Sequence, residues 1–276
     1  MRKNFTLSSL VLIMCSIFSD CSRVPLTGRS QLSLVPENEM LSLSLTQYQQ
    51  FLTENKVSAN AASTAMVQRC GKKIALAVEE YLRQQGLESR ISDFKWEFNL
   101  VESEEPNAWC MAGGKVVVYS GLLPIAQNEA GLAVVLSHEI AHAVARHGSE
   151  RMSQQLALQY GGVALSVAMA KKSASTQSLV NQVYGVGGNL GVLAYSRTHE
   201  YEADKMGIIF MSKAGYDPSV AISFWQRMSQ MSGSAETPEI LRTHPLDENR
   251  ISAIEEILPK AMEIYNRTQG KGRSSK

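Results

Sequence analysis

The sequence predicts an α+β fold that is mainly helical and forms a single domain. Three observations lead to this class. Apolar residues recur at helical spacing over several long stretches, only a few short stretches have the pattern of strands, and strands and helices do not alternate as they do around a parallel sheet. The chain has 276 residues, 44% of them hydrophobic, and can bury a large core. We expect a small antiparallel sheet beside one of the helices.

The first part of the body predicts two helices. Apolar residues are spaced for one helix over residues 37 to about 56 and for a second over residues 61 to about 85. Gly86 follows the second stretch and is a typical helix stop. We take residues 37–266 as the main domain.

Three strands are expected next. Residues 94–100 alternate strictly between apolar and polar side chains, which predicts a half-buried strand. Residues 107–112 and 115–120 flank the pair Gly113-Gly114. Two strands around a Gly-Gly pair predict a tight hairpin.

The pattern then changes to long helices. Asn128 can cap a helix that runs to His147, and Gly148 stands where it can end that helix. Residues 152–194 are apolar, small and Gly-rich, which favours a packed or interfacial helix pair over a membrane span. We expect this insert to act as a lid or as a membrane-facing surface, with plain core helices as the alternative.

The C-terminal part predicts two further helices. The first covers about residues 190–214 and is closed by Gly215. The second is amphipathic and covers about residues 247–266. A basic polar tail, residues 267–276, follows it.

The N-terminus has the pattern of a secretory signal. Two basic residues precede an apolar run over residues 5–18, which is too short to span a bilayer comfortably, and we take residues 1–20 as the signal peptide. Cys21 follows and is a candidate lipid acceptor, and Ser22 after it is compatible with sorting to a bacterial outer membrane. Residues 21–36 are expected to form an extended leader.

The stretch S-H-E-I-A-H-A-V-A-R-H-G, residues 137–148, raises the question of a metal site. His138 and His142 are four residues apart and therefore emerge on the same helix face. Two imidazoles on this pitch can share one zinc ion, and Glu139 can take a proton from a water at the metal. Coincidence is the alternative, but an otherwise apolar helix has no packing reason to bury these polar groups. The motif predicts one Zn²⁺ per chain.

A catalytic zinc needs a third protein ligand. Residues 196–204, S-R-T-H-E-Y-E-A-D, lie on a helical stretch in which Glu200 and Asp204 are again four residues apart. One of the two can bind the metal while the other holds a ligand histidine by its free ring nitrogen. Spacing alone leaves Glu202 and His199 as equal alternatives for the ligand.

The order H-E-x-x-H and then E-x-x-x-D on a later helix resembles the gluzincin metallopeptidases of peptidase family forty-eight, which include the HtpX and CAAX prenyl proteases. Three further segments resemble the periplasmic, Oma-like branch of that family: residues 24–32 (V-P-L-T-G-R-S-Q-L), 107–122 (N-A-W-C-M-A-G-G-K-V-V-V-Y-S-G-L) and 243–251 (T-H-P-L-D-E-N-R-I). The resemblance covers about residues 24–266. It implies a minigluzincin fold with the sheet beside the H-E-x-x-H helix.

Carried over to this chain, the resemblance implies that His138, His142 and Glu200 bind zinc. It also implies that Glu139 is the general base. Asp204 would brace a zinc histidine, and we expect that histidine to be His138.

Roles are also expected for several neighbouring residues. The resemblance places His244 near the active site, where it would fill the fourth zinc position or stabilise the oxyanion; a surface-loop histidine is the alternative. We expect His147 and His199 to be structural. Arg197 and Arg250 are expected to pair with carboxylates rather than to act in chemistry.

Endopeptidases commonly hold an extended substrate against an exposed strand edge. We expect residues 107–112 to form that edge, with four substrate-binding residues: Asn107, Ala108, Trp109 and Cys110. Backbone pairing reads no side chains, so cleavage should favour unfolded chains over one particular sequence.

The expected function is that of an exported zinc-dependent endopeptidase that removes unfolded or misassembled envelope proteins, located in the periplasm and anchored to the outer membrane through Cys21. The alternative is a non-catalytic exported lipoprotein that uses a metallopeptidase fold for binding or chaperone work. The formal charge of +1, without a dense basic run, excludes a nucleic-acid partner. No oligomeric state and no pairing of Cys70 with Cys110 is predicted.

Overall fold

The fold is described from a computed structural model. It describes four stretches of the chain: residues 21–169, 195–231, 237–246 and 248–274. The signal peptide predicted over residues 1–20 and the second part of the predicted insert, residues 170–194, lie outside the described residues. Within the described part the architecture is α+β and mainly helical, as the sequence predicts.

The main sheet has three strands, and their order in space is β3–β5–β4. β5 (Lys115–Tyr119) is central, β3 (Glu97–Val101) runs parallel to it, and β4 (Ala108–Met111) runs antiparallel to it at the edge. The sheet is therefore mixed and not wholly antiparallel. The predicted hairpin is present between β4 and β5, where Gly113 and Gly114 adopt φ values of +82° and +78° that favour glycine.

Helices from the described part of the chain pack against this sheet, namely α2 (Glu37–Glu54), α3 (Ala61–Gln84) and α5 (Glu129–Val144). Side chains alternate between the two faces of the strands. Val116 and Val118 belong to the main core, together with buried residues of α3 and α5. Val117 and Trp109 point to the other face and pack with Tyr48 of α2. The edge strand β4 is thus held between α2 and α5.

α5 begins as the sequence predicts, because the Asn128 side chain accepts hydrogen bonds from the first backbone N–H groups of the helix. It ends earlier than predicted. Arg146 takes a left-handed conformation with φ of +58°, and its guanidinium pairs with Glu37 and Asp93. The prediction that Gly148 ends the helix is wrong, since Gly148 lies inside the following helix, α6.

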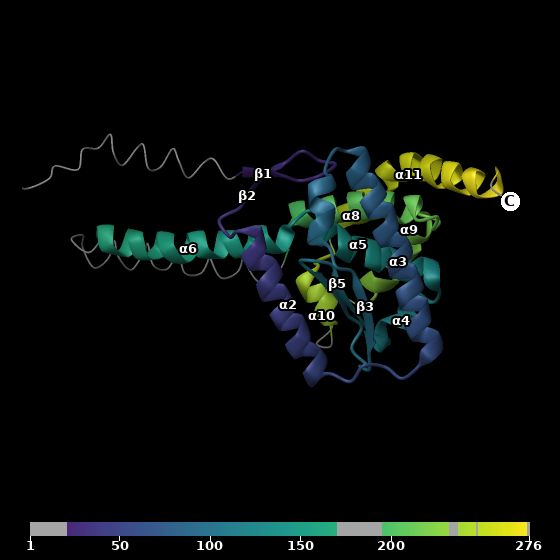
Figure 1. Cartoon of the computed structure of the whole chain (residues 1–276), viewed down its shortest axis with the longest axis horizontal. Coiled ribbons are helices and arrows are strands. Elements are labelled where there is room, and N and C mark those ends of the chain that lie inside the picture. Colours follow the sequence, from purple (N-terminus) through teal and green to yellow (C-terminus); the bar gives the residue numbers. More distant parts are fainter. Residues whose placement is uncertain (1–20, 170–194, 232–236, 247, 275–276) are drawn as a thin grey trace, which may run out of the picture.

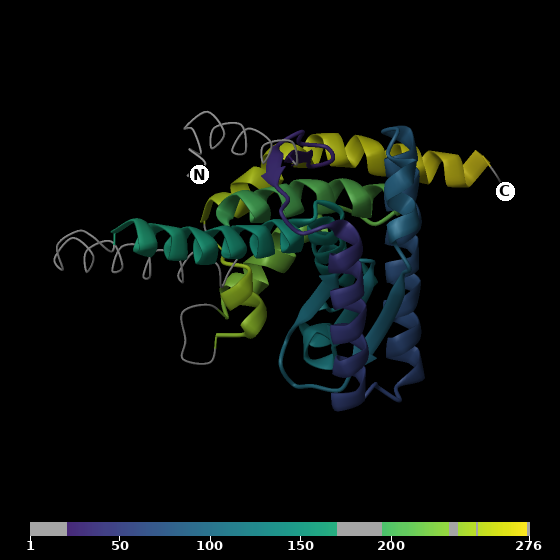
Figure 2. The ribbon, with the colours of Figure 1, turned by 60° about the vertical axis from the view of Figure 1, so that its left-hand side comes forward.

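The other helices complete the body: α6 (His147–Met169), α8 (Arg197–Lys213), α9 (Val220–Ser229), α10 (Glu239–Thr243) and α11 (Glu248–Ser274). α8 packs against both α5 and α11. α6 projects away from the body in both views (Figures 1 and 2). It carries the first part of the predicted insert. α11 continues past Asn266 to Ser274, so most of the expected tail is helical.

Short elements connect these parts: η2 (Glu88–Asp93), η3 (Ser120–Leu122) and α4 (Leu123–Ala126). The expected extended leader contains a small antiparallel hairpin of β1 (Cys21–Arg23) and β2 (Ser30–Leu32). Among the described helices, none has both the length and the apolar character required to cross a bilayer.

Candidate metal centre

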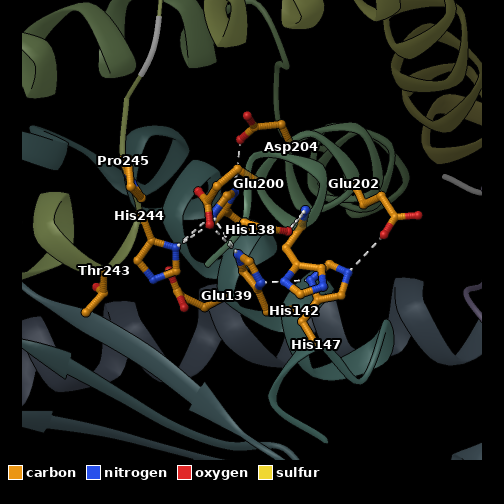
Figure 3. Close-up of polar contacts among 12 residues, drawn as sticks. His138, Glu139, His142, His147, Glu200, Glu202, Asp204, Thr243, His244 and Pro245 are labelled. Carbon is orange, nitrogen blue, oxygen red and sulfur yellow. Dashed lines mark hydrogen bonds and ion pairs between the residues drawn. The ribbon is translucent and has the colours of Figure 1, made fainter. Parts of the chain in front are cut away.

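Three elements bring the predicted site residues together. α5 presents His138, Glu139 and His142, α8 presents Glu200, and the segment after α10 presents His244 (Figure 3). The ring of His244 points at Glu200 and Glu139. This histidine is 4% exposed, so the alternative of a surface-loop histidine is wrong.

The backbones of α5 and α8 approach closely, and Gly207 makes this possible. A Cβ atom added at Gly207 would lie 3.0 Å from the His138 nitrogen and 3.1 Å from the Ser137 oxygen. Any larger residue would push the helices apart. Glu200 lies seven residues, about two helical turns, before Gly207 and therefore on the same face of α8. The close approach sets how near the Glu200 carboxylate comes to the histidines of α5.

Donor atoms from four buried side chains lie within 4.8 Å of one another: His138, His142, Glu200 and His244. The Nε2 atoms of His138 and His142 are 3.0 Å apart. The two carboxylate oxygens of Glu200 each lie 3.4 Å from one of these nitrogens. His244 Nδ1 lies 3.1 Å from Glu200 Oε1. Of the alternatives for the third ligand, only Glu200 is in this group. Glu202 contacts His147 and Arg29, and His199 contacts Glu150.

Asp204 lies on the far side of the His138 ring. Its Oδ1 atom is 2.9 Å from His138 Nδ1, so it holds the ring nitrogen that faces away from the centre. Arg250, from α11, donates to both oxygens of Asp204 and pairs with Glu200 Oε2 at 2.7 Å. The Arg250 guanidinium also lies 4.5 Å from the ring centre of Trp225. Arg250 pairs with carboxylates as predicted, but the sequence did not indicate that one of them would be the candidate metal ligand Glu200.

Burial and the contacts between neighbouring groups shift the pKa values at the centre in different directions. Burial acts to lower the pKa of His138, but the hydrogen bond to Asp204 and the charge of Glu200 outweigh it and raise this pKa to about 9. Burial acts to raise the pKa of Glu200, but the three neighbouring histidines, His244 first, hold it well below its usual range. Burial lowers the pKa of His142 well below its usual range and that of His147 to about 4.

Glu139 differs from the other carboxylates of the centre. Its Oε1 atom is buried and has no hydrogen-bond partner among the described residues, and His244 Nε2 lies 3.6 Å away. Burial raises the pKa of Glu139 above its ordinary value. A buried carboxylate oxygen without a partner is costly unless a further group binds it. Its position suits proton exchange with a molecule held at the centre.

The donor set fits a zinc ion. Imidazole nitrogens and a carboxylate oxygen are ligands that zinc takes in tetrahedral sites. His138 Nε2, His142 Nε2 and a Glu200 oxygen point to one place, and beside it lies the buried Oε1 atom of Glu139, which has no hydrogen-bond partner in the described part of the chain.

A small cavity of about 190 Å³ opens beside Glu139 and His244, and Cys110 and Arg151 line it. A wider groove of about 580 Å³ lies next to it and runs between α2, β4 and the start of α6. The small cavity is lined by all four predicted substrate-binding residues: Asn107, Ala108, Trp109 and Cys110. All of these except Ala108 also line the groove. The predicted edge strand therefore leads to the centre.

Tyr195 is a site residue that the sequence analysis missed. Its ring centre is 4.0 Å from that of His142 and 4.9 Å from that of His244, and it lines both cavities. Burial raises the pKa of its hydroxyl to about 12, so the phenol stays protonated. Tyr195 directly precedes Ser196, which caps α8. The position of Tyr195 next to the N-cap of the helix that carries Glu200 is the sequence signal by which it could have been found.

The comparisons with known proteins agree with this geometry. The model of "Peptidase family M48" matches residues 45–258. Mitochondrial metalloendopeptidase OMA1 of Schizosaccharomyces pombe is 34% identical over 88% of this chain and 68% of its own length. The protein of the same name in Saccharomyces cerevisiae is 30% identical over 92% of this chain and 74% of its own length. The beta-barrel assembly-enhancing protease of Escherichia coli is 35% identical over 56% of this chain and 33% of its own length.

These relatives correct the predicted location. The N-terminal sequence predicts a bacterial periplasm with an outer-membrane anchor, but the relatives that match most of this chain are named as mitochondrial enzymes. The prediction of an outer-membrane lipoprotein is therefore wrong. It rested on the two basic residues and the short apolar run at the N-terminus and on Cys21 and Ser22 after them.

Proposed function

Because the chain belongs to peptidase family M48 and is a metalloendopeptidase, we propose that its metal ion is zinc and that its substrates are unfolded or misassembled proteins. The observation that carries this proposal is the convergence of His138, His142 and Glu200 beside the unpartnered oxygen of Glu139. Zinc is the ion that this mixture of imidazole and carboxylate ligands suits.

In this proposal His138, His142 and Glu200 hold the ion, and their second contacts orient them. Asp204 accepts the Nδ1 proton of His138, which leaves the Nε2 lone pair directed at the centre. Arg250 pairs with the carboxylates of Glu200 and Asp204 and fixes both in place. When bound, the ion supplies a Lewis acid that polarises the peptide carbonyl and makes a water molecule more acidic.

Glu139 is the proposed general base and acid. The water oxygen adds to the carbonyl carbon while the Glu139 carboxylate takes a proton from the water. Glu139 then delivers this proton to the amide nitrogen, and the C–N bond breaks to leave a carboxylic acid and an amine. The raised pKa of Glu139 suits the first step, because a more basic carboxylate accepts the proton more readily.

His244 lies where it can contribute in either of two ways. Its Nδ1 atom faces Glu200 and its Nε2 atom faces Glu139, so the ring reaches both the metal ligands and the base. It can fill a fourth ligand position through Nδ1, or donate from Nε2 to the oxygen that becomes negative during attack.

Substrate binding is proposed along the free edge of β4. Tyr119 N donates to Asn107 O, and strand pairing alternates, so Trp109 directs its backbone groups at β5 while Cys110 directs its own outwards. The Ala108 N–H is already bonded to the Asn107 side chain. Cys110 lines the small cavity, and among the described residues no backbone partner faces its outward N–H and C=O, so it offers a donor and an acceptor to an extended peptide. Backbone pairing of this kind requires an unfolded segment of substrate.

Removal of the metal is the first test. We expect purified protein to contain about one zinc per chain by elemental mass spectrometry and to digest casein. Dialysis against a chelator should abolish the digestion, and one equivalent of zinc should restore it. Protein that digests casein equally well with no bound metal would contradict the proposal.

The strand edge gives a second test. Cys110→Pro removes the outward N–H but suits an edge position, whereas Cys110→Ala loses the same sulfur and keeps the N–H. We expect kcat/KM on an extended peptide to be about tenfold lower for the proline variant than for the alanine variant, the value of one hydrogen bond. Both variants should bind zinc equally. Equal kcat/KM values would show that no substrate hydrogen bond is made there.

A further inference from the structure

A second buried polar cluster lies beside the metal centre, and the mechanism above does not use it. It consists of five residues from three separate parts of the chain: Arg29, His147, Glu150, His199 and Glu202. The four residues other than Arg29 are buried. The rings of His147 and His199 stack with centres 4.4 Å apart. Burying so many ionisable groups costs free energy unless they pair with one another in good geometry and form further hydrogen bonds.

The cluster touches the metal centre at one point. His147 Nδ1 lies 2.9 Å from His142 Nδ1, the ring nitrogen of His142 that faces away from Glu200. On its other side His147 Nε2 lies 3.2 Å from Glu202 Oε2. The labelled side chains in Figure 3 show this path from His142 through His147 to Glu202.

The far end of the path is held by the loop between β1 and β2. Arg29 Nε donates to Glu202 Oε2 at 2.8 Å, and Thr27 Oγ1 donates to Glu202 Oε1 at 2.5 Å. Arg29 also forms a bidentate pair with Glu150 at 2.8 and 2.7 Å. The loop is fixed to the body, because Val24 beside it is 1% exposed and belongs to the main core.

The contacts impose one direction of hydrogen bonding. A metal-binding His142 Nε2 carries a lone pair, so its proton is on Nδ1 and is donated to His147 Nδ1. His147 must then carry its own proton on Nε2, and it donates this proton to Glu202. The carboxylate of Glu202 can only accept, and Arg29 and Thr27 fix it in place. Each donor in the path meets one acceptor.

We propose that the β1–β2 loop is a positioning element of the metal centre: Thr27 and Arg29 fix Glu202, Glu202 fixes His147, and His147 holds His142 in the tautomer that binds the ion. The inference rests on the proposed function, since it takes His142 as a zinc ligand. Each of the two α5 ligands then has its own carboxylate on α8. Asp204 serves His138 directly, and Glu202 serves His142 through a second imidazole.

The test measures affinity for zinc alone, by competition with a chromophoric chelator. His147→Leu removes the acceptor of the His142 proton, and Arg29→Gln releases Glu202. We expect zinc affinity to fall by about 10- to 100-fold in His147→Leu and by about 10-fold in Arg29→Gln, the usual cost of losing such a partner. His147→Asn offers an amide oxygen near the position of Nδ1, and it should keep most of the affinity that His147→Leu loses.

Arg146→Gln is the matched control. Arg146 also pairs with two carboxylates, and its side chain is 22% exposed against 26% for Arg29, but that side chain contacts Glu37 and Asp93 and not the side chains of this path. Its loss should lower the thermal stability of the metal-free protein without changing zinc affinity. Thermal unfolding of every metal-free variant shows whether the fold is intact.

The outcomes separate the two proposals. Zinc binding that is lost in His142→Ala but unchanged in Arg29→Gln and His147→Leu would overturn the positioning role and leave the proposed function standing. Equal losses in His147→Asn and His147→Leu would also overturn it, because packing alone would then explain both. Wild-type protein that binds no zinc would overturn both proposals.

Discussion

Replacing Glu139 by glutamine is expected to lower kcat for peptide hydrolysis by about 10²- to 10⁴-fold, the range of a general base and acid. The amide has nearly the same shape but cannot take a proton from water. Zinc content should not change, because Glu139 is not among the four side chains whose donor atoms converge. Steady-state kinetics on a quenched fluorescent peptide, with the metal content measured in the same sample, gives both quantities.

Glu129→Gln on the same helix is the control for this experiment. Glu129 lies in the first turn of α5 and pairs with Arg69, away from the centre, so its variant should keep wild-type kcat. A Glu139→Gln protein that holds zinc and cleaves within tenfold of wild type would refute the general-base role. Equal biological function of that variant without proteolysis would instead favour the binding or chaperone alternative.

The second large effect is expected on stability. Arg250→Met removes a guanidinium that is 1% exposed and leaves the buried carboxylates of Glu200 and Asp204 without it. Breaking such a buried pair costs about 3–5 kcal/mol, because the remaining charges stay in a site poor in water. Urea unfolding of metal-free protein at neutral pH measures the loss. Zinc should recover part of it, since binding to the folded state stabilises that state.

The contrast is provided by Arg267→Met on the same helix. Arg267 pairs with Glu263, but both side chains are largely exposed, at 75% and 68%. Such pairs contribute little to stability. We expect no measurable change in the urea midpoint of this variant. An unchanged urea midpoint for Arg250→Met would show that the pairing of Arg250 with Glu200 and Asp204 does not stabilise the fold.

The sequence allowed much of the centre to be predicted because its key spacings are local. His138 and His142 share a helix face by periodicity, and the same rule puts Asp204 on the face of Glu200. The choice between Glu200 and Glu202 is a matter of helix phase. Residues two apart point to nearly opposite sides, so only one can face α5. Gly207, on the Glu200 face, was an available signal, since a close helix contact requires a small residue.

Other features depend on contacts between distant segments, and no local pattern encodes them. The α5–α6 break at Arg146 depends on ion pairs with α2 and with the residues before β3. The parallel pairing of β3 with β5 depends on how the chain returns between them. Arg29 precedes Glu202 by 173 residues, so only the fold reveals their contact. The short helices α9 and α10 were missed, because segments of 10 and 5 residues carry little periodic signal.

The centre draws on the β1–β2 loop, α5, α8 and the segment between α10 and α11, which span most of the described sequence. No fragment released early during synthesis contains all of them. A chain of which only a part has emerged or folded therefore lacks the complete centre. In the proposed arrangement, proteolysis begins only after segments from both ends of the described sequence have folded onto α5 and α8.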